Sequence, residues 1–303
     1  MAIYVFKYSD AGAPSLTSAN GTLISVLDFC LVTGMGWEKT SSDTNTATYR
    51  ASTGNRFYLG VDDSLGTYAR VRGFEVHPYA GVTLGANSLG AFPTDSFLSG
   101  GSYFYKNTTT TYSDWLLVSD GTMFYLSSYL PQNGRSDMIG FGDFIPYSTY
   151  DRFNTCIIAN KNTSEYYLAA VSSTINGTDN NCKFIARSIS GIGSCVKAEY
   201  IADYSKTNDT LLGRGGASYP NVYLNTLNIG DIEISENRSF VRGRLPGLYY
   251  PKHPRPLNHD TVVSGSGVLE NKQFIYRNIG GHSNGDPNAI GALFFEISDT
   301  WRT

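Results

Sequence analysis

Short runs of apolar, aromatic and β-branched residues recur along most of the chain, and turn-forming residues separate them. In the first half, these runs predict strands at residues 3–8, 46–51, 57–61, 68–76, 97–105, 115–119, 122–129, 138–144 and 155–159. In the second half, they predict strands at residues 166–171, 183–188, 197–204, 222–227, 231–234, 261–264, 273–276 and 292–297. We therefore expect a mainly β fold, with β-sandwich or barrel-like packing of many short antiparallel strands.

One short N-terminal helix is expected near residues 20–33, where apolar residues recur at helical spacing. The side chains that share one face of this helix are those of Leu23, Leu27, Cys30 and Leu31. Ser18 or Asn20 can cap the helix by accepting a backbone N–H. Gly34 is expected to end it, because glycine tolerates the left-handed conformation at a helix end.

Turn residues separate several of the predicted strands. Asp120 and Gly121 predict a tight hairpin, because the Asp-Gly pair favours positive φ. Residues 62–66, which begin with Asp62 and Asp63, are also interpreted as a turn. These two carboxylates are a possible pair for glycosidic chemistry. Neighbouring strand residues point to opposite faces, however, which disfavours joint action.

The length of 303 residues is typical of one large domain or two ordinary ones. We expect an N-terminal β-rich domain over residues 1–155, which holds the helix, and a C-terminal β-rich domain over residues 156–303. The second domain contains a proline-rich stretch at residues 245–256, which its prolines should hold extended. An extended arm of this kind can lie along a neighbouring subunit.

Composition narrows the class of protein. Hydrophobic residues make up 41% of the chain and charged residues 16%, and the formal net charge is -3. This balance favours a globular chain and gives no electrostatic footprint for nucleic acid. No apolar run reaches the ~20 residues of a membrane span, so no membrane insertion is expected. The first residues do not resemble a signal peptide.

His253, His259 and Asp260 are the strongest candidates for chemistry, since two imidazoles and a carboxylate can bind a metal ion. The intervening prolines do not place both rings on one face of a regular element, so a decorated extended segment is the favoured interpretation. The cysteines are Cys30, Cys156, Cys182 and Cys195, without the spacing of a zinc site. A disulfide between the last two stays open. We expect no cofactor.

No catalytic motif occurs in the sequence, and we expect no enzymatic activity. Carboxylates whose pairing the sequence does not reveal leave a hydrolase as an open alternative; they are Glu38, Asp43, Asp143 and Glu165. Aromatic residues suggest a sugar-stacking platform, because flat rings pack on the apolar faces of sugars. Those concerned are Trp37, Trp115, Trp301, Tyr103, Phe104, Tyr105, Tyr166, Tyr167, Tyr249 and Tyr250. Packing within sheets and at interfaces is the favoured alternative, because aromatic residues are enriched in strands.

Six short motifs occur in order along nearly the whole chain. They are YSDAGAP (8–14, followed by the predicted helix), NRFYL (55–59), ARVRGFE (69–75), GFGDF (140–144), GRLPGL (243–248) and EISDTW (296–301). The series resembles a family of phage virion structural proteins associated with the tail or neck. The resemblance implies a place in a particle and transfers no catalytic residue. It also implies assembly in the reducing cytoplasm of a bacterial host, where free thiols are expected.

We therefore expect a virion protein that assembles as a repeated subunit of the neck, collar or tail. Its partners would be copies of itself and other virion proteins, met through low-charge, tyrosine-rich surfaces. The residues expected at the interface are Tyr249, Tyr250, Pro251, His253, Pro254, Pro256 and Trp301. The alternative is a receptor- or carbohydrate-binding tail protein, with a glycan on the host surface as partner. Position in the particle, symmetry and copy number stay open.

Overall fold

The computed structural model describes residues 2–78, 90–94, 100–107, 113–130, 135–160, 181–193, 195–201, 229–236, 240–251, 259–266, 269–278, 292–298 and 300–302. Within them the chain forms 19 strands, all paired antiparallel, and one helical segment. This confirms the mainly β fold with one short helix. The predicted strands at 166–171 and 222–227 lie outside the described residues. None of the described helical turns has the length and apolarity of a membrane span.

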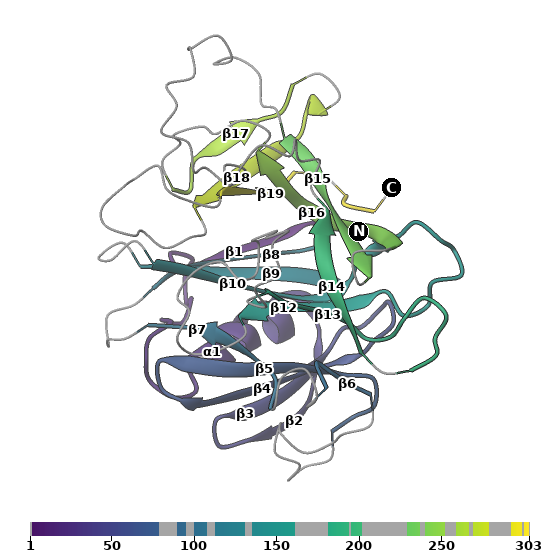
Figure 1. Cartoon of the computed structure of the whole chain (residues 1–303). Coiled ribbons are helices and arrows are strands. Elements are labelled where there is room, and N and C mark those ends of the chain that lie inside the picture. Colours follow the sequence, from purple (N-terminus) through teal and green to yellow (C-terminus); the bar gives the residue numbers. More distant parts are fainter. Residues whose placement is uncertain are drawn as a thin grey trace.

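The strands form three layers, stacked from bottom to top in Figure 1. The first layer contains β2 (Glu38–Asp43), β3 (Thr46–Arg50), β4 (Tyr58–Leu65), β5 (Tyr68–Phe74), β6 (Ala91–Phe92) and β7 (Ser102–Tyr105). The middle layer contains β1 (Tyr4–Lys7), β8 (Asp114–Ser119), β9 (Met123–Leu130), β10 (Arg135–Asp143), β12 (Thr155–Asn160) and β13 (Asn181–Ile185). The third contains β11 (Ile145–Pro146), β15 (Ile229–Glu236), β16 (Phe240–Pro251), β17 (Val262–Ser264), β18 (Gln273–Asn278) and β19 (Ala292–Glu296).

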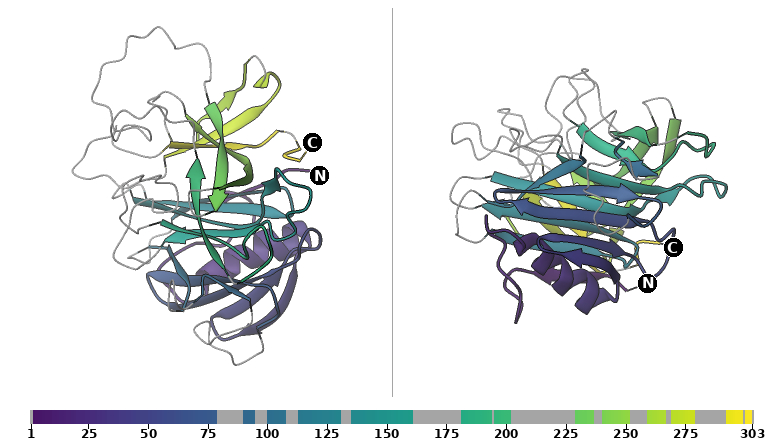
Figure 2. Two further views of the ribbon diagram at one scale, coloured as in Figure 1. Left: turned by 45° about the vertical axis from the view of Figure 1, so that its right-hand side comes forward. Right: turned by 90° about the horizontal axis from the view of Figure 1, so that it is seen from below.

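Strand β14 (Val196–Ile201) joins the middle and third layers. Its first residues pair with β13, and those from Ala198 to Ile201 pair with β15. In the left view of Figure 2 the third layer follows directly on the middle one. Strands on the two sides of the predicted domain boundary at residue 155 belong to one sheet, because β10 pairs with β12 from Gly140 to Asp143.

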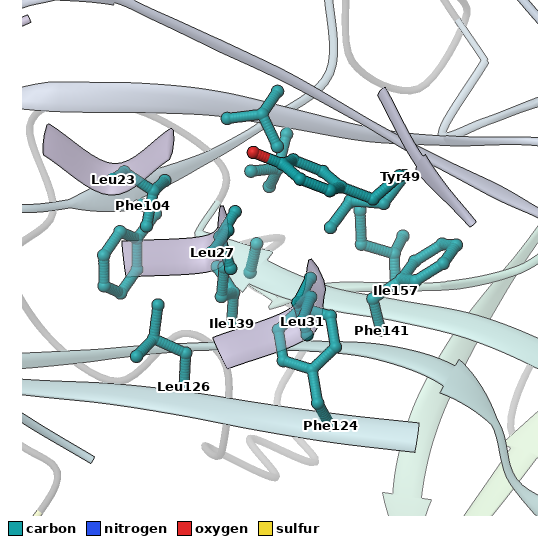
Figure 3. Packing of buried hydrophobic residues seen from close by; sticks show 14 of the residues in the cluster. Leu23, Leu27, Leu31, Tyr49, Phe104, Phe124, Leu126, Ile139, Phe141 and Ile157 are labelled. Atoms are coloured by element: carbon teal, nitrogen blue, oxygen red, sulfur yellow. The ribbon is translucent and has the colours of Figure 1, made fainter. Parts of the chain in front are cut away.

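The middle layer is buried on both faces. Along β9, Phe124 and Leu126 face the first core, whereas Met123 and Tyr125 face the second. The same alternation holds on β8, β10, β12 and β13. Figure 3 shows the first core, where Leu27 and Leu31 of the helix pack against the middle strands. The middle strands therefore have continuous apolar runs, as expected of strands covered on both sides.

The helix begins with α1 (Thr22–Leu27) and continues as a π-helix, η1 (Asp28–Gly34). It lies between the first and middle layers (Figure 1). The predicted caps are wrong, since Gly21 takes the N-cap position without a side-chain bond. The left-handed conformation predicted at Gly34 is found at Gly36, with φ of 70°, and Gly34 is instead the last residue of η1. A Cβ there would lie 2.3 Å from the ring of Phe6, so close packing requires the glycine.

The turn predicted at residues 62–66 is confirmed only at its last residue, because residues 62–65 lie in β4. The Asp63 carboxylate accepts hydrogen bonds from the backbone N–H groups of Leu23 (2.7 Å) and Ile24 (3.4 Å). It also pairs with the Lys106 ammonium, and neither of the two side chains is exposed. A bulge between Asp62 and Leu65 aims this carboxylate inward. The turn itself comes later, and Gly66 has φ of 67° there.

The proline-rich stretch is extended as predicted, but its described part is not an arm. Residues 245–251 lie in β16, which pairs with β15 on one side and with β11 and β19 on the other. Leu245 and Leu248 are buried in the second core. Residues 252–256 lie outside the described part of the chain.

Candidate interaction face and polar pocket

Two of the predicted interface residues are buried within their own chain. The Tyr249 hydroxyl donates a hydrogen bond to Oε2 of Glu296 at 2.8 Å. The Trp301 indole packs against Gly247 and Tyr125, and its Nε1 donates to the Glu296 carbonyl at 3.2 Å. Both rings therefore stabilise the third layer.

For the other predicted interface residues, the structure describes at most the backbone. The backbones of Tyr250 and Pro251 pair with Gly230 and Ile229 of β15. His253, Pro254 and Pro256 lie outside the described residues, so their contact with a neighbouring subunit stays a prediction.

His259 and Asp260, the described members of the predicted metal group, bind Arg277 instead. Nη1 of Arg277 lies 2.6 Å from Nε2 of His259, and its Nε lies 2.7 Å from Oδ1 of Asp260. The second pair is not aligned as a hydrogen bond, so its attraction is Coulombic. Burial and then the Arg277 charge hold the pKa of His259 well below its ordinary value. The imidazole is thus neutral, and the lone pair that a metal would use faces the guanidinium.

Within the described part of the chain, no three His, Cys, Asp or Glu side chains are grouped as a metal site. Asp143 accepts hydrogen bonds from the Thr155 hydroxyl (2.5 Å) and the Asn55 N–H (2.7 Å). Glu38 pairs with Arg50 and Arg56 at the surface. Asp43 accepts a bond from the backbone of its neighbour. The Asp120 carboxylate lies close enough to raise the pKa of Asp143, with Arg302 bound to the Asp120 side chain and to the Asp143 carbonyl. Glu165 lies outside the described residues.

The predicted aromatic platform is divided among several sites. Trp37 and Trp115 are core residues whose Nε1 atoms donate to the carbonyls of Gly121 and Pro14, each at 2.9 Å. Phe104 and Tyr105 are also buried. Tyr166 and Tyr167 lie outside the described residues. The four buried rings therefore form no platform at the surface.

Beside Trp301 the third layer forms a small pocket of about 110 Å³. Its lining comes from four segments of the chain that meet there: Asp231, Arg244, Leu245, Pro246, Gly247, Tyr249, Lys272, Thr300 and Trp301. Two cations and one carboxylate therefore face a space that is bordered by aromatic rings. Sequence reasoning selected Tyr249 and Trp301 here but missed Arg244, Lys272 and Asp231, which long-range strand pairing brings in.

The two cations of the pocket differ in their partners. Lys272 donates a hydrogen bond to Oε1 of the buried Glu296 at 2.8 Å, so its charge is compensated. Arg244 approaches Asp231 only to 3.7 Å, and both side chains are partly exposed. This distance is beyond a hydrogen bond. The guanidinium of Arg244 thus retains donors that point to solvent at the pocket.

Arg242 is the centre of a buried polar network next to this pocket. Its guanidinium donates two hydrogen bonds of 2.7 Å to Asp151, and neither side chain is exposed. Its Nη1 also donates to Glu236 at 2.9 Å and to the Arg187 carbonyl at 2.8 Å. A bidentate, charge-assisted pair of this kind fixes geometry. It holds together the loops that follow β11 and β13 and the end of β15.

Large apolar side chains are exposed around this network. They are Tyr147 (56% exposed), Tyr150 (87%), Ile192 (79%) and Phe240 (49%), and we call them the Arg242 face. Tyr147 donates its backbone N–H to the Arg242 carbonyl at 2.9 Å, and Phe240 precedes Arg242 by two residues on β16. Four of the seven exposed large hydrophobic residues in the described chain therefore lie on segments tied to one arginine.

No protein-family model matches this chain, and no curated protein shows significant sequence similarity to it.

Proposed function

We propose that this protein is a structural subunit of a phage virion, repeated in the neck, collar or tail, and that the Arg242 face contacts a neighbouring subunit. The motif series along the sequence supports the location in a particle. The observation that carries the contact is the exposure of Tyr150 and Ile192 on loops that the buried Arg242 holds in place, through its ion pair with Asp151 and its hydrogen bond to the Arg187 carbonyl. Exposed apolar groups on a rigid support are typical of interaction sites.

The proposal predicts that polar substitution on this face blocks assembly without unfolding the protein. The variants Tyr150→Ser and Ile192→Ser change exposed side chains, and such changes usually alter stability by only about 0.5 kcal/mol. Val76→Ser, at an exposed apolar position on the first layer, is the matched control.

The measurement is incorporation into purified particles, by mass spectrometry, after each variant replaces the wild-type gene. Incorporation at least tenfold lower for Tyr150→Ser and Ile192→Ser, with Val76→Ser unaffected, is the expected result. Normal incorporation of both face variants would reject the assembly face. Absence of the wild-type protein from particles would reject the virion role.

A second candidate function is glycan binding, as in a tail protein that recognises a host surface. The pocket beside Trp301 favours it, because charged and hydroxyl groups meet aromatic rings there. Binding of the full chain to a glycan array, lost in Arg244→Gln, would support this function. An array with no bound glycan would count against it.

A further inference from the structure

The pocket beside Trp301 has room for one small polar ligand. Its volume of about 110 Å³ is below the ~300 Å³ at which sites for drug-sized ligands begin. A single sugar ring that inserts one edge suits a pocket of this size better than a polymer chain does. The chemistry of the lining then decides which kind of sugar is recognised.

Arg244 is the lining group best suited to bind an incoming anion. Its nearest charged neighbour, Asp231, is 3.7 Å away, and both groups retain contact with solvent. A guanidinium presents a planar fork that matches a carboxylate in two parallel hydrogen bonds. The other cation, Lys272, is bound to Glu296, which compensates its charge and makes it the weaker site for an incoming anion.

Two tyrosines lie near Arg244. Tyr249 lines the pocket itself. Tyr147 lies close enough for Arg244 and Asp231 to act on its hydroxyl, whose pKa is raised to about 12 by burial and by its hydrogen bond to Glu233. The Tyr147 ring is more than half exposed. The Tyr147 ring therefore offers a face on which a sugar can stack, close to the Arg244 guanidinium.

Asp231 supplies the remaining requirement for a sugar. An ionised carboxylate accepts hydrogen bonds only, so it suits the hydroxyl groups of a pyranose and repels a bare anion. An anion alone would gain at Arg244 and lose at Asp231. A ligand that carries both a carboxylate and hydroxyls satisfies both side chains at once.

We propose that this pocket binds a carboxylated pyranose, such as a hexuronic acid, with the carboxylate on Arg244, hydroxyls on Asp231 and the ring beside Tyr147. This inference rests on the second proposed function, glycan binding, and names its ligand class. It shares Tyr147 with the Arg242 face, so it is tested on the isolated chain, where no neighbouring subunit covers this ring.

The test is a ligand-observed NMR titration of the full chain with D-glucuronate, D-glucose and acetate. For a ligand of this size we expect a dissociation constant on the order of 1 mM for D-glucuronate. D-glucose and acetate should each bind at least tenfold more weakly. Arg244→Gln should weaken D-glucuronate binding at least tenfold, and Arg244→Lys should weaken it less, because the charge remains while the fork is lost.

Arg56→Gln is the matched control, since Arg56 is an exposed, ion-paired arginine in the first layer. It should leave D-glucuronate binding unchanged. Equal binding of acetate would overturn the sugar assignment, and equal binding of D-glucose would overturn the role of the carboxylate while leaving glycan binding intact. No D-glucuronate binding, or binding that Arg244→Gln and Arg244→Lys leave unchanged, would overturn the site.

Discussion

The Lys106 ammonium donates a hydrogen bond to the Asp63 carboxylate, and both side chains are fully buried. The same carboxylate receives the first N–H groups of the helix, from Leu23 and Ile24. Burial raises the pKa of Asp63 and lowers that of Lys106, while their mutual attraction opposes both shifts. One aspartate thus links the helix, the first layer and the segment that follows β7.

Removal of this carboxylate should be strongly destabilising. We expect Asp63→Asn to lower the free energy of unfolding by about 3–5 kcal/mol, because it leaves a buried ammonium without a counter-charge. Urea denaturation measures the change. Asp62→Asn, whose partner is the exposed Ser64, should cost less than about 1 kcal/mol. In the double variant Asp63→Leu with Lys106→Met, the loss should be smaller than in Asp63→Asn; an equal or larger loss would contradict the ion-pair explanation.

Asp137 should make stability depend on pH. Burial raises its pKa to about 7, against the bonds it accepts from the N–H groups of Tyr105 and Met138. The folded chain therefore binds more protons than the unfolded chain between about pH 4 and pH 7. The free energy of unfolding should fall as pH rises through this window, by up to about 4 kcal/mol, and stay level above it.

Unfolding midpoints at pH 5 and pH 8 measure this dependence. Asp137→Asn should flatten the profile, whereas the exposed Asp43→Asn should leave it unchanged. The pKa values of Asp63 and Asp143 are also raised, so the stability of Asp137→Asn should still fall slightly with pH. A stability that rises from pH 5 to pH 8 would contradict the assignment.

Gly247 and Trp301 should behave as a coupled pair. Gly247 has φ of 68°, and a Cβ there would lie 1.9 Å from the indole ring. Gly247→Ala should therefore be destabilising, and Trp301→Ala should cost about 3–5 kcal/mol through the cavity it leaves. The double variant should lose less than the sum, because the clash disappears with the ring. Additive losses of stability in thermal or urea unfolding would show that the cost of Gly247→Ala does not come from a clash with the Trp301 ring.

The buried thiols should resist modification. Burial raises the pKa of Cys30, Cys156 and Cys195, and the three are free cysteines. A thiolate is the reactive form. In Cys182→Ser, we expect no reaction with a disulfide reagent in the native state and three reactive thiols in denaturant. Rapid reaction of the native variant would show that one of the three is accessible.

Local sequence chemistry predicted much of the fold. Asp120 and Gly121 do form the hairpin between β8 and β9, where the Asp120 side chain accepts the N–H groups of Thr122 and Met123. The β-branched and aromatic residues of β5 lie where the pattern placed a strand. These elements depend on neighbours within a few residues, and such contacts are visible in the sequence.

Contacts between distant residues explain what the sequence did not reveal. The polar strand β2 has no apolar pattern and is held by backbone pairing with β3. The local sequence predicts that Asp63 lies in a turn, because its partner Lys106 is 43 residues away. In the candidate site, the pairing of Arg242 with Asp151 spans 91 residues, so no local motif points to it. Burial of Trp301 likewise depends on close packing against the backbone of Gly247. The prolines around Gly247 predict an extended arm and give no sign of this contact.

The alternation along the middle layer has a consequence for how this protein tolerates change. Phe124 and Leu126 belong to one core, and Tyr125 between them belongs to another. The loss of stability from a substitution at position 124 should therefore be recovered by a change at position 126 or in the helix. A change at position 125 should have no effect on that loss. Odd and even positions of a single strand should therefore vary as two separate groups, so one core can be redesigned while the other keeps its sequence.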